Sequence, residues 1–508
     1  MFRQGLKRSR RRGLLWLTVL FCVFVVSQSR AIAAPIDLRP YWQAAQAQID
    51  DFQLPNGLQF IVMRRPQAPV VSVLTYAAVG GADEQPGQTG IAHFLEHLAF
   101  KGTTTIGTRN YAEEAPLLTE LDQLNRQLQQ AQAKGQDATA LTQRFQAVQA
   151  QAAQYVRQNE FGQRLENAGA IGLNATTSAD ATTYFCSLPA QQLELWMALE
   201  AERFRQPVFR EFFEEKAVIL EERRQRLDND PVSQLLEALK AKAFPNQPYG
   251  RPVIGERADI AALDRATVQQ FFQQYYGPNN LTIAIVGDVD PAQVRRWANQ
   301  YFGAEPARPL PPPSQGKAKP QAGTVTIKAR SQPWAIVAYP MPAARDPDQL
   351  AMQLLAEVLS RGRRSRLYQT LVEGDRLVLS AQAFPNFPGD RLPSLFVISA
   401  SPRPGITPQT VVQAITATVT ELQQQPLSQA ELDRVRNQLR MDLLQGLESN
   451  AGLAQQLAEY QAEAGDWRQL FRDLEALEQI TPLDLQRAAR RLFQRDRQLV
   501  GQILGEGT

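Results

Sequence analysis

The sequence predicts an α+β protein built from more than one domain. Its 508 residues exceed the usual size of a single domain, so two to four compact units are expected. β-rich runs and helical stretches alternate in both halves of the chain, and a proline-rich segment, residues 305–322, is predicted as the linker between them. With 44% hydrophobic and 21% charged residues, the composition is that of a globular protein, neither disordered nor membrane-embedded.

Residues 1–33 have the layout of a secretory signal peptide. Six basic residues within the first twelve positions precede an apolar run at 13–26, and Ala31-Ile32-Ala33 offers small residues for cleavage. An uncleaved membrane anchor is the alternative, but the run is short for a bilayer span of roughly 20 residues. We therefore expect export to the periplasm or another extracytoplasmic compartment, with membrane association only if the segment is kept.

Removal of this segment changes the charge balance. The full chain has 54 Lys and Arg against 51 Asp and Glu, but seven of the basic residues and none of the acidic ones lie in 1–33, which leaves a net charge of −4. No basic patch with interleaved aromatic side chains is left, so nucleic-acid binding is not expected. Cys186 then stands alone, which excludes an intramolecular disulfide and a four-cysteine zinc site. It is expected to be a small buried side chain.

The first half, residues 50–304, is predicted to start as β-β-α. Residues 52–79 are interpreted as a hairpin with a turn at Asn56-Gly57, and a short helix opens at Gly90. Strand-like runs and helices then alternate. The strand-like runs lie at 173–188 and 280–287, and the helices lie at 193–204 and 211–227.

Residues 112–160 differ from their surroundings because they are rich in Gln and Ala. Apolar residues recur there in steps of four and three on both sides of a breaker at 134–137, which predicts an antiparallel coiled-coil hairpin. The recurring positions are Leu117, Leu121, Leu124, Leu128 and Ala131, then Leu141, Phe145, Val148, Ala152 and Tyr155. We interpret the hairpin as a surface insertion; a docking arm or a wall of a substrate chamber is the alternative.

The second half, residues 323–508, repeats the order of strands followed by helices. Strands are predicted at 333–339 and 395–400, a helix at 346–359, and two long helical stretches close the chain. No motif aligns between the halves, so an internal duplication is suggested by the element order alone.

The segment His93-Phe94-Leu95-Glu96-His97 carries the strongest chemical signal. It holds the only two histidines of the chain, four residues apart. Residues i and i+4 of a helix share a face, so both imidazoles can reach one ion, and zinc accepts imidazole nitrogen readily. Zinc lowers the pKa of a bound water to roughly 7, so Glu96 could take its proton as general base. A chance pair of surface histidines is the alternative.

A catalytic zinc site typically has a third protein ligand. Because no other histidine and no useful cysteine exist, this ligand should be an Asp or a Glu. The predicted helix at 212–227 is rich in glutamate: Glu214, Glu215, Glu221 and Glu222. Glu215 and Glu222 are seven residues apart on one face, so one could bind the metal while the other supports a histidine. For each of these glutamates, a solvated helix face is the alternative.

With these residues, the chain resembles the pitrilysin/insulinase family of inverzincin zinc metallopeptidases, and within it the processing peptidase-like group. The likeness runs from about Phe52 to the C-terminus, interrupted by 112–160. Five segments carry it in order: Leu54–Leu58, Gly90–Thr103, Asn174–Ser178, Val218–Glu222 and Val286–Pro291. Together and in this order they are highly specific.

The resemblance implies a fold and further roles. The fold is two similar domains, each an antiparallel sheet packed with helices. The last residue of the family's Glu-x6-Glu pattern binds the metal, which implies Glu222 as ligand and Glu215 as its supporting partner. His97 and Glu222 are 125 positions apart, longer than usual in the family, and the insertion accounts for the excess. Asn174 and Ala175 match the edge strand that pairs with substrate backbone; a polar strand without a ligand is the alternative.

One expected feature of the second half is missing. Single-chain active relatives carry there an arginine and, seven residues later, a tyrosine that hold the substrate. The matching positions are Val372 and Leu379, which cannot donate a hydrogen bond to a developing oxyanion. We therefore predict a heterodimer in which a related subunit supplies the pair. The alternative is that the pair was lost and weak activity remains.

The sequence thus predicts a zinc metalloendopeptidase that acts on peptides or unfolded protein segments. One Zn²⁺ per chain is expected, and zinc is favoured over cobalt or manganese by the ligand types. The main alternative is a non-catalytic scaffold or assembly subunit of the same fold, against which the complete set of site residues argues. A coiled-coil interaction protein is a third reading that rests on 112–160 alone.

Overall fold

The computed structural model describes residues 39–312 and 320–505. The predicted signal peptide and the middle of the predicted linker lie outside these residues. The chain divides into a unit of residues 1–47, in which α2 (Arg39–Gln46) is described, and a unit of residues 48–508. None of the described helices combines the length and the hydrophobicity of a membrane span.

The first half is built on a six-stranded sheet with the order β1-β2-β6-β3-β5-β4. All pairs are antiparallel except β2 with β6, which run parallel. Every residue of β6 is buried, as expected for a strand in the middle of the sheet, whereas β5 alternates between buried and partly buried positions. The strands are β1 (Ile49–Gln53), β2 (Gln59–Arg64), β3 (Val70–Ala77), β4 (Ile171–Thr177), β5 (Thr182–Pro189) and β6 (Leu281–Gly287).

The predicted hairpin at 52–79 is only partly correct. The Asn56-Gly57 turn joins β1 to β2, and Gly57 takes the left-handed conformation that the turn requires (φ 89°). However, β2 and β3 do not pair with each other, because β6 lies between them and bonds to both. This central strand comes from more than 200 residues further along the chain, so local sequence could not reveal it.

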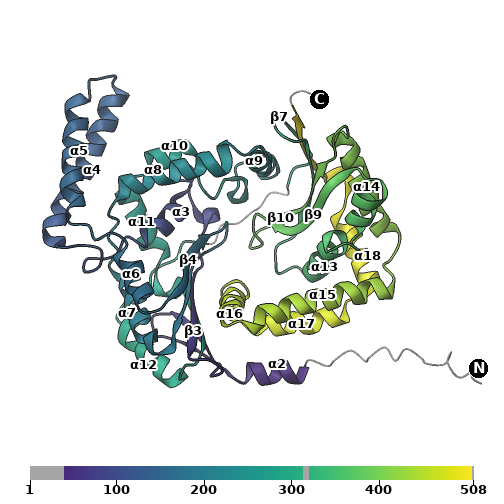
Figure 1. Ribbon diagram of the computed structural model, residues 1–508, viewed down its shortest axis with the longest axis horizontal. Helices are drawn as coiled ribbons and strands as arrows, with labels where there is room; N and C mark the ends of the chain where they lie inside the picture. The colour runs from purple at the N-terminus through teal and green to yellow at the C-terminus, as the bar shows by residue number, and fades with distance from the viewer. Residues whose placement is uncertain (1–38, 313–319, 506–508) are drawn as a thin grey trace, which may run out of the picture. The chain divides into compact units, whose positions relative to one another are not determined.

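Helices surround the first sheet. α7 and α12 lie on one of its faces, as Figure 1 shows, and α12 packs on β2. The main helices are α3 (Ile91–Leu98), α4 (Tyr111–Ala133), α5 (Thr139–Ala153), α6 (Glu160–Asn167), α7 (Leu193–Arg205), α8 (Phe212–Arg223), α9 (Pro231–Ala243), α10 (Arg257–Ala262), α11 (Arg265–Tyr275) and α12 (Pro291–Phe302). A π-helical turn, Arg224–Asp228, joins α8 to α9.

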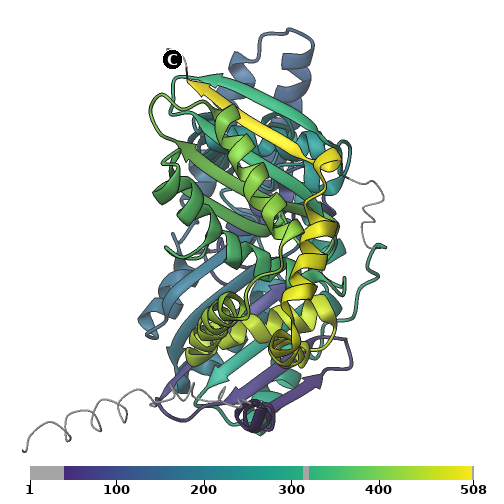
Figure 2. The same cartoon turned by 90° about the vertical axis from the view of Figure 1, so that its right-hand side faces the viewer.

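The second half repeats the same strand arrangement. Its sheet has the order β7-β11-β8-β10-β9, and the pair β7 with β11 is parallel while the others are antiparallel (Figure 2). Taken in chain order, its five strands occupy the same places as β2 to β6, so the two halves are similar domains. The strands are β7 (Gly323–Ala329), β8 (Trp334–Met341), β9 (Val378–Phe387), β10 (Ser394–Pro402) and β11 (Leu499–Gly505).

The two halves exchange helices. α9, from the first half, packs on β7 and β11 of the second sheet, where Leu235 and Leu239 join a common apolar core. α16, from the second half, packs on β3 and β6 of the first sheet. The helices of the second half are α13 (Gln349–Ser360), α14 (Pro408–Gln424), α15 (Gln429–Glu448), α16 (Asn450–Ala464), α17 (Gln469–Gln479) and α18 (Pro482–Leu492).

The segment predicted as a coiled-coil hairpin forms the two packed helices α4 and α5, which project from the rest of the first half in Figure 1. Predicted seam positions such as Leu121, Leu124 and Val148 are buried. The base of the hairpin is attached to the first half: Phe145 contacts the ring of Phe213 edge-on, with 5.0 Å between centroids. The hairpin therefore does not bury its apolar surface entirely within itself.

Candidate metal centre

A glycine N-cap and a buried carboxylate fix the start of α3. Its N-cap, Gly90, has a left-handed backbone (φ 87°), and a Cβ there would lie 2.6 Å from the carbonyl oxygen of Ile254, so only glycine fits. The buried carboxylate of Glu84 accepts hydrogen bonds from the backbone N–H groups of Gly90 and Ala92, both at 2.9 Å. It thereby satisfies donors that the first turn of a helix leaves free, and it fixes where the helix starts.

The two faces of α3 differ: one packs in the core, and the other carries the polar side chains. Ile91, Phe94, Leu95 and Leu98 are buried in the core of the first half. His93, Glu96 and His97 lie on the less buried face, as expected from positions three and four residues apart. The helical period therefore places both imidazoles and the carboxylate together.

Glu222 on α8 brings the third ligand. One of its carboxylate oxygens lies 3.8 Å from Nε2 of His93 and the other lies 3.5 Å from Nε2 of His97. The three ligand atoms all lie within 4.8 Å of one another, and no other such group of His, Cys, Asp or Glu occurs in residues 39–312 and 320–505. The structure thus brings Glu222 to both imidazoles, while Glu221 is half-exposed and pairs with Arg224 at 2.6 Å.

The donor set fits a zinc ion. Zinc binds imidazole nitrogen and carboxylate oxygen at about 2.0–2.2 Å, so ligand atoms around one ion lie roughly 3 to 4 Å apart. The distances of 3.8 and 3.5 Å from the Glu222 oxygens to the two imidazoles fall in this range. The ligands are partly accessible, with 12 to 23% of each side chain exposed, which leaves room for a water molecule or a substrate. Arg226, bonded to Glu222 at 2.7 Å, is 75% exposed and is not held in place by burial.

The two imidazoles have different proton affinities. Burial, aided by the charges of His97 and Arg226, lowers the pKa of His93 to about 3, so it is neutral and available to a metal at neutral pH. Burial also acts to lower the pKa of His97. The hydrogen bond to Glu215 and the charges of Glu215, Glu222 and Glu96 outweigh burial and raise it. A metal ion at His97 would therefore compete with a proton that this imidazole binds more tightly than a free one does.

Glu215 pairs with His97 at the ring nitrogen that does not face Glu222. Its carboxylate lies 3.1 Å from Nδ1 of His97, the ring nitrogen that faces away from Glu222. Lys101 pairs with the other carboxylate oxygen at 2.6 Å. Burial acts to raise the pKa of Glu215, but the bonds from His97 and Lys101 outweigh it and lower the pKa, so Glu215 is ionised. An ionised carboxylate at Nδ1 orients the ring so that Nε2 faces the metal position.

Glu96 stands beside the ligands without joining them. Thr177, the last residue of β4, donates a short hydrogen bond to its carboxylate. Burial raises the pKa of Glu96 and outweighs the lowering by Thr177 and by the charge of His97. A carboxylate with a raised pKa next to a metal position suits proton transfer near neutral pH.

Asn174 and Ala175 lie on β4, the edge strand of the first sheet. Ala175 is buried, whereas Asn174 is exposed and its side chain accepts a hydrogen bond from the backbone of Ala175 at 2.9 Å. β4 pairs with β5 on one side only and packs beside α3, so its other edge runs toward the metal position.

A pocket of about 350 Å³ adjoins this edge. It is lined by His93, Glu222 and Thr177 on the metal side and by Val253 and Phe387 on the other. Phe387 comes from the second half, so both halves border the space next to the metal position.

Val372 and Leu379 lie in the second half, away from these residues in the fold. Val372 is in the π-helical turn Tyr368–Gly374 and packs on the core of that half, and Leu379 lies on β9 with 48% of its surface exposed. Neither side chain has a hydrogen-bonding group, as the sequence predicted.

Sequence reasoning missed three residues that support the site: Glu84, Lys101 and Thr177. Lys101 and Thr177 lie inside segments that the family resemblance had already marked, four residues after His97 and at the end of β4. No sequence pattern indicated Glu84. Its carboxylate lies six residues before the N-cap Gly90, and whether it reaches the helix depends on the path of the intervening loop.

Comparisons with known proteins bear on the family and the fold. A family model described as insulinase, peptidase family M16, matches residues 59–136 and 148–257, and a model described as peptidase M16 inactive domain matches residues 262–439. The chain belongs to the insulinase (M16) peptidase family. The gap within the first match, 137–147, falls in the α4–α5 hairpin.

Related proteins carry protease names. The zinc protease PqqE of Helicobacter pylori is 27% identical over 438 residues, which cover 83% of this chain and 86% of that protein. The crystal structure of a protease from Helicobacter pylori matches with a TM-score of 0.75 and 25% identity, over 90% of this chain and 99% of the other. The fold of the M16 proteases is therefore present over nearly the whole described chain.

The periplasmic protease PqqL of Escherichia coli has the same fold at 20% identity and a TM-score of 0.67. That match covers 90% of this chain but 48% of PqqL, and a structure of the first half of PqqL is covered to 92%. In terms of fold, this chain corresponds to one half of that longer protein.

Proposed function

We propose that this protein is a zinc-dependent endopeptidase that hydrolyses peptides or unfolded protein segments. In this proposal, His93, His97 and Glu222 hold one zinc ion and Glu96 acts as general base. The observation that supports it is the convergence of two imidazoles and one carboxylate, with their atoms within 4.8 Å of one another, beside the carboxylate of Glu96, which is not part of that group. The zinc protease names of relatives such as PqqE support the choice of metal.

The side chains around the site have distinct tasks. A bound zinc ion would polarise the substrate carbonyl and lower the pKa of a bound water. Glu96, kept in orientation by Thr177, takes a proton and passes it to the leaving amine. Glu215, ionised and paired with Lys101, holds His97 with Nε2 toward the metal position. The three ligands alone could bind an ion; Glu96 is what makes hydrolysis possible.

The substrate is proposed to bind as an added strand along β4, at Asn174 and Ala175. An extended peptide gains backbone hydrogen bonds from an edge strand without demanding a particular sequence. This favours peptides and unfolded segments over folded proteins, because a folded substrate cannot offer a free strand. The pocket beside His93 and Phe387 would then receive a side chain next to the scissile bond.

A related subunit is proposed as partner. Val372 and Leu379 cannot supply hydrogen bonds to the substrate carbonyl, and loss of one such donor costs on the order of 100-fold in rate. The match of 90% of this chain to about half of a longer periplasmic protease supports the view that this chain is one half of an active assembly.

The proposed location is outside the cytoplasm. The predicted signal peptide at 1–33 would export the chain, and the structural neighbour PqqL is a periplasmic protease.

The test is purification of the mature chain, alone and with a related subunit that lacks the His-x-x-Glu-His motif. Zinc content is measured, and cleavage of an unstructured quenched-fluorescence peptide is followed. One zinc per chain and hydrolysis that a chelator stops and zinc restores are expected, with the rate much higher in the mixture. Full activity of the monomeric chain would refute the requirement for a partner subunit. Zinc binding without hydrolysis in either sample would favour the non-catalytic subunit, an alternative that the inactive-domain match over 262–439 keeps open.

A further inference from the structure

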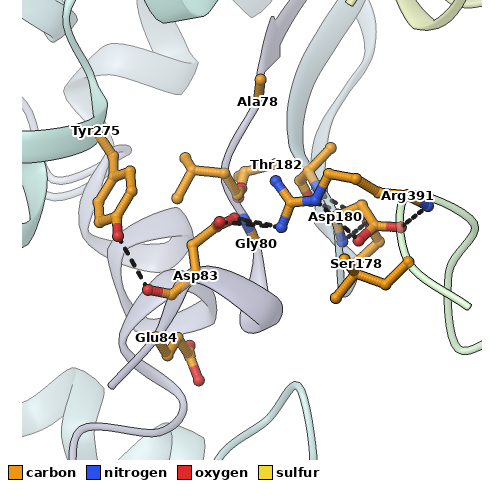
Figure 3. A network of polar contacts seen from close by, with 12 residues as sticks. Ala78, Gly80, Asp83, Glu84, Ser178, Asp180, Thr182, Tyr275 and Arg391 are labelled. Atoms are coloured by element: carbon orange, nitrogen blue, oxygen red, sulfur yellow. Dashed lines mark hydrogen bonds and ion pairs between the residues drawn. The ribbon is translucent and has the colours of Figure 1, made fainter. Parts of the chain in front are cut away.

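The two halves meet at equivalent hairpin loops next to the metal centre. The turn between β4 and β5 contains Asp180, and the loop between β9 and β10 contains Asp390 and Arg391. Asp180 accepts hydrogen bonds from the backbone N–H groups of Asp390 and Arg391, at 3.0 and 3.2 Å, and from the hydroxyl of Tyr249 at 2.6 Å. Figure 3 shows Asp180 and Arg391 at this junction.

Glycine allows the loops to approach this closely. A Cβ on Gly389 would lie 2.2 Å from a carboxylate oxygen of Asp180 and 2.6 Å from the hydroxyl of Tyr249. A Cβ on Gly80 would lie 2.5 Å from the carbonyl oxygen of Ser178. The backbone at Gly80 therefore lies directly against the backbone at Ser178, and the backbone at Gly389 lies directly against the side chains of Asp180 and Tyr249. In such close packing, a displacement of one segment is transmitted to the others.

Arg391 is the cation that the second half brings to this junction. Its guanidinium donates to both carboxylate oxygens of Asp83, at 3.0 and 2.9 Å, and its Nε lies 3.5 Å from Asp180 (Figure 3). The two aspartates are nearly buried, with 7 and 8% of their side chains exposed. Two buried carboxylates are costly without a counter-charge, and Arg391 of the second half supplies a positive charge that pairs with both of them.

The two aspartates belong to the two segments that frame Glu96. Asp83 lies next to Glu84, whose carboxylate caps the helix that carries Glu96. Asp180 lies three residues after Thr177, which donates to the carboxylate of Glu96. The segments also bond directly, from the N–H of Gly81 to Ser178 and from the N–H of Ala82 to Ala179, at 3.0 and 2.7 Å.

We propose that Arg391 is a positioning residue of the metal centre: by bridging Asp83 and Asp180, it sets the position of α3 relative to the end of β4, and with it the contact between Thr177 and Glu96. The second half would then contribute to the reaction of the first through a residue that touches neither metal nor substrate. This inference rests on the proposed peptidase function for its kinetic consequence, but its structural consequence can be measured without any activity.

The test compares Arg391→Met with Arg468→Met. Arg468 also joins the halves, through an ion pair with Asp51 at 3.0 Å, but Asp51 lies on β1, at the opposite edge of the sheet from β4. Hydrolysis is assayed under the conditions in which the wild type is active. For Arg391→Met, kcat should fall about 10- to 100-fold, because small misplacements of a catalytic group have effects of this size, while one zinc stays bound. For Arg468→Met, kcat should stay within about twofold of the wild type.

Hydrogen exchange gives the measurement that does not depend on activity. In the zinc-bound protein, Arg391→Met should speed exchange of the amides of Gly81, Ala82, Gly90 and Ala92, which bond across the junction or cap α3, and Arg468→Met should not. Unchanged exchange in Arg391→Met would overturn the proposal even if the protein proves not to be a peptidase. If the wild type binds zinc and hydrolyses nothing, the proposed function fails instead.

Two further variants separate positioning from mere stability. Asp83→Asn combined with Arg391→Met removes the buried carboxylate together with its counter-charge, so thermal stability should recover toward the wild type. If kcat recovers with it, Arg391 is only a structural cation and the proposal is wrong. Arg391→Lys keeps the charge but cannot bridge both aspartates with a planar fork, so it should restore stability and only part of kcat.

Discussion

The two halves of this protein share a strand arrangement but differ in the helix that follows β3 in the first half and the equivalent strand β8 in the second half. In the first half this helix is α3, which carries His93, Glu96 and His97 on its accessible face. In the second half it is α13, in which eight of twelve residues are buried and no histidine occurs. Its one acidic residue, Glu357, lies 3.8 Å from Arg361 of the following turn.

This difference shows that the fold does not depend on the metal centre. α13 uses nearly its whole surface for packing, so the same place in the fold is stable with an apolar helix. The first half gives up part of that packing to expose three polar side chains, and it needs Glu84, Glu215 and Thr177 to hold them. Of two similar domains, the first thus carries the proposed metal site, and the second supplies packing contacts.

The largest expected effect comes from Glu96, the carboxylate of the first half that we propose as general base. Glu96→Gln should lower kcat/KM by roughly 100- to 10,000-fold, because proton acceptance is lost while all metal ligands stay. Its matched control is Glu357→Gln on the equivalent helix α13, which should leave the rate unchanged. Peptide cleavage and zinc content are measured for both. Equal rates for the Glu96 variant and the wild type would refute the mechanism.

The next effect concerns zinc binding by α8. Glu222→Gln should weaken zinc binding by more than about 100-fold, because a ligand is lost. Glu215→Gln should weaken it by about 10- to 100-fold, because only the orientation of His97 is lost. Glu221→Gln is the control, since Glu221 is half-exposed and pairs with Arg224. Competition with a chromophoric chelator gives the affinities, and a loss at Glu221 would show that the ligand had been misassigned by one residue.

A smaller effect is the pH dependence of zinc affinity. The chain has no histidine outside α3, and the pKa of His97 is raised by its bond to Glu215 and by the nearby carboxylates, which together outweigh burial. A proton must leave this imidazole before zinc can bind. Affinity should therefore be constant above the raised pKa and fall about tenfold per pH unit below it. Glu215→Gln removes the main cause of the shift and should move the onset to lower pH; an onset that does not move would contradict this assignment.

The smallest effect is expected from shortening the helical hairpin, which has no counterpart between α13 and β9 in the described second half. Replacing residues 125–139 by a short glycine-rich turn removes the outer part and keeps the pair Glu120–Arg144. Zinc content and melting temperature should stay close to those of the wild type. Deleting 115–157 should instead destabilise the protein, because Arg265 loses its partner Asp122 and Phe213 loses Phe145. Equal stability of the two deletions would show that the base does not support the core.

Much of the fold could be predicted because the signals were local. The Asn56-Gly57 turn, the heptad steps of α4 and α5, and the strand–helix order of both halves follow from residues close together in sequence. The placement of β6 between β2 and β3 could not be predicted, because tertiary packing determines which strands pair. The exchange of α9 and α16 between the halves gave no sequence signal either, since an apolar helix face does not reveal which sheet it will cover.

For the site, the sequence by itself determined what one helical turn can determine: two imidazoles and a carboxylate, four residues or fewer apart, must share the face of α3. It also determined the seven-residue spacing that puts Glu215 and Glu222 on one side of α8. Only the tertiary structure decided that Glu222, rather than Glu221, faces both imidazoles and that Thr177 reaches Glu96. It likewise brought Arg391 to Asp83, 308 residues away. Such contacts depend on how separate elements pack. The energy of that packing comes from the whole core, so no single segment of the sequence predicts it.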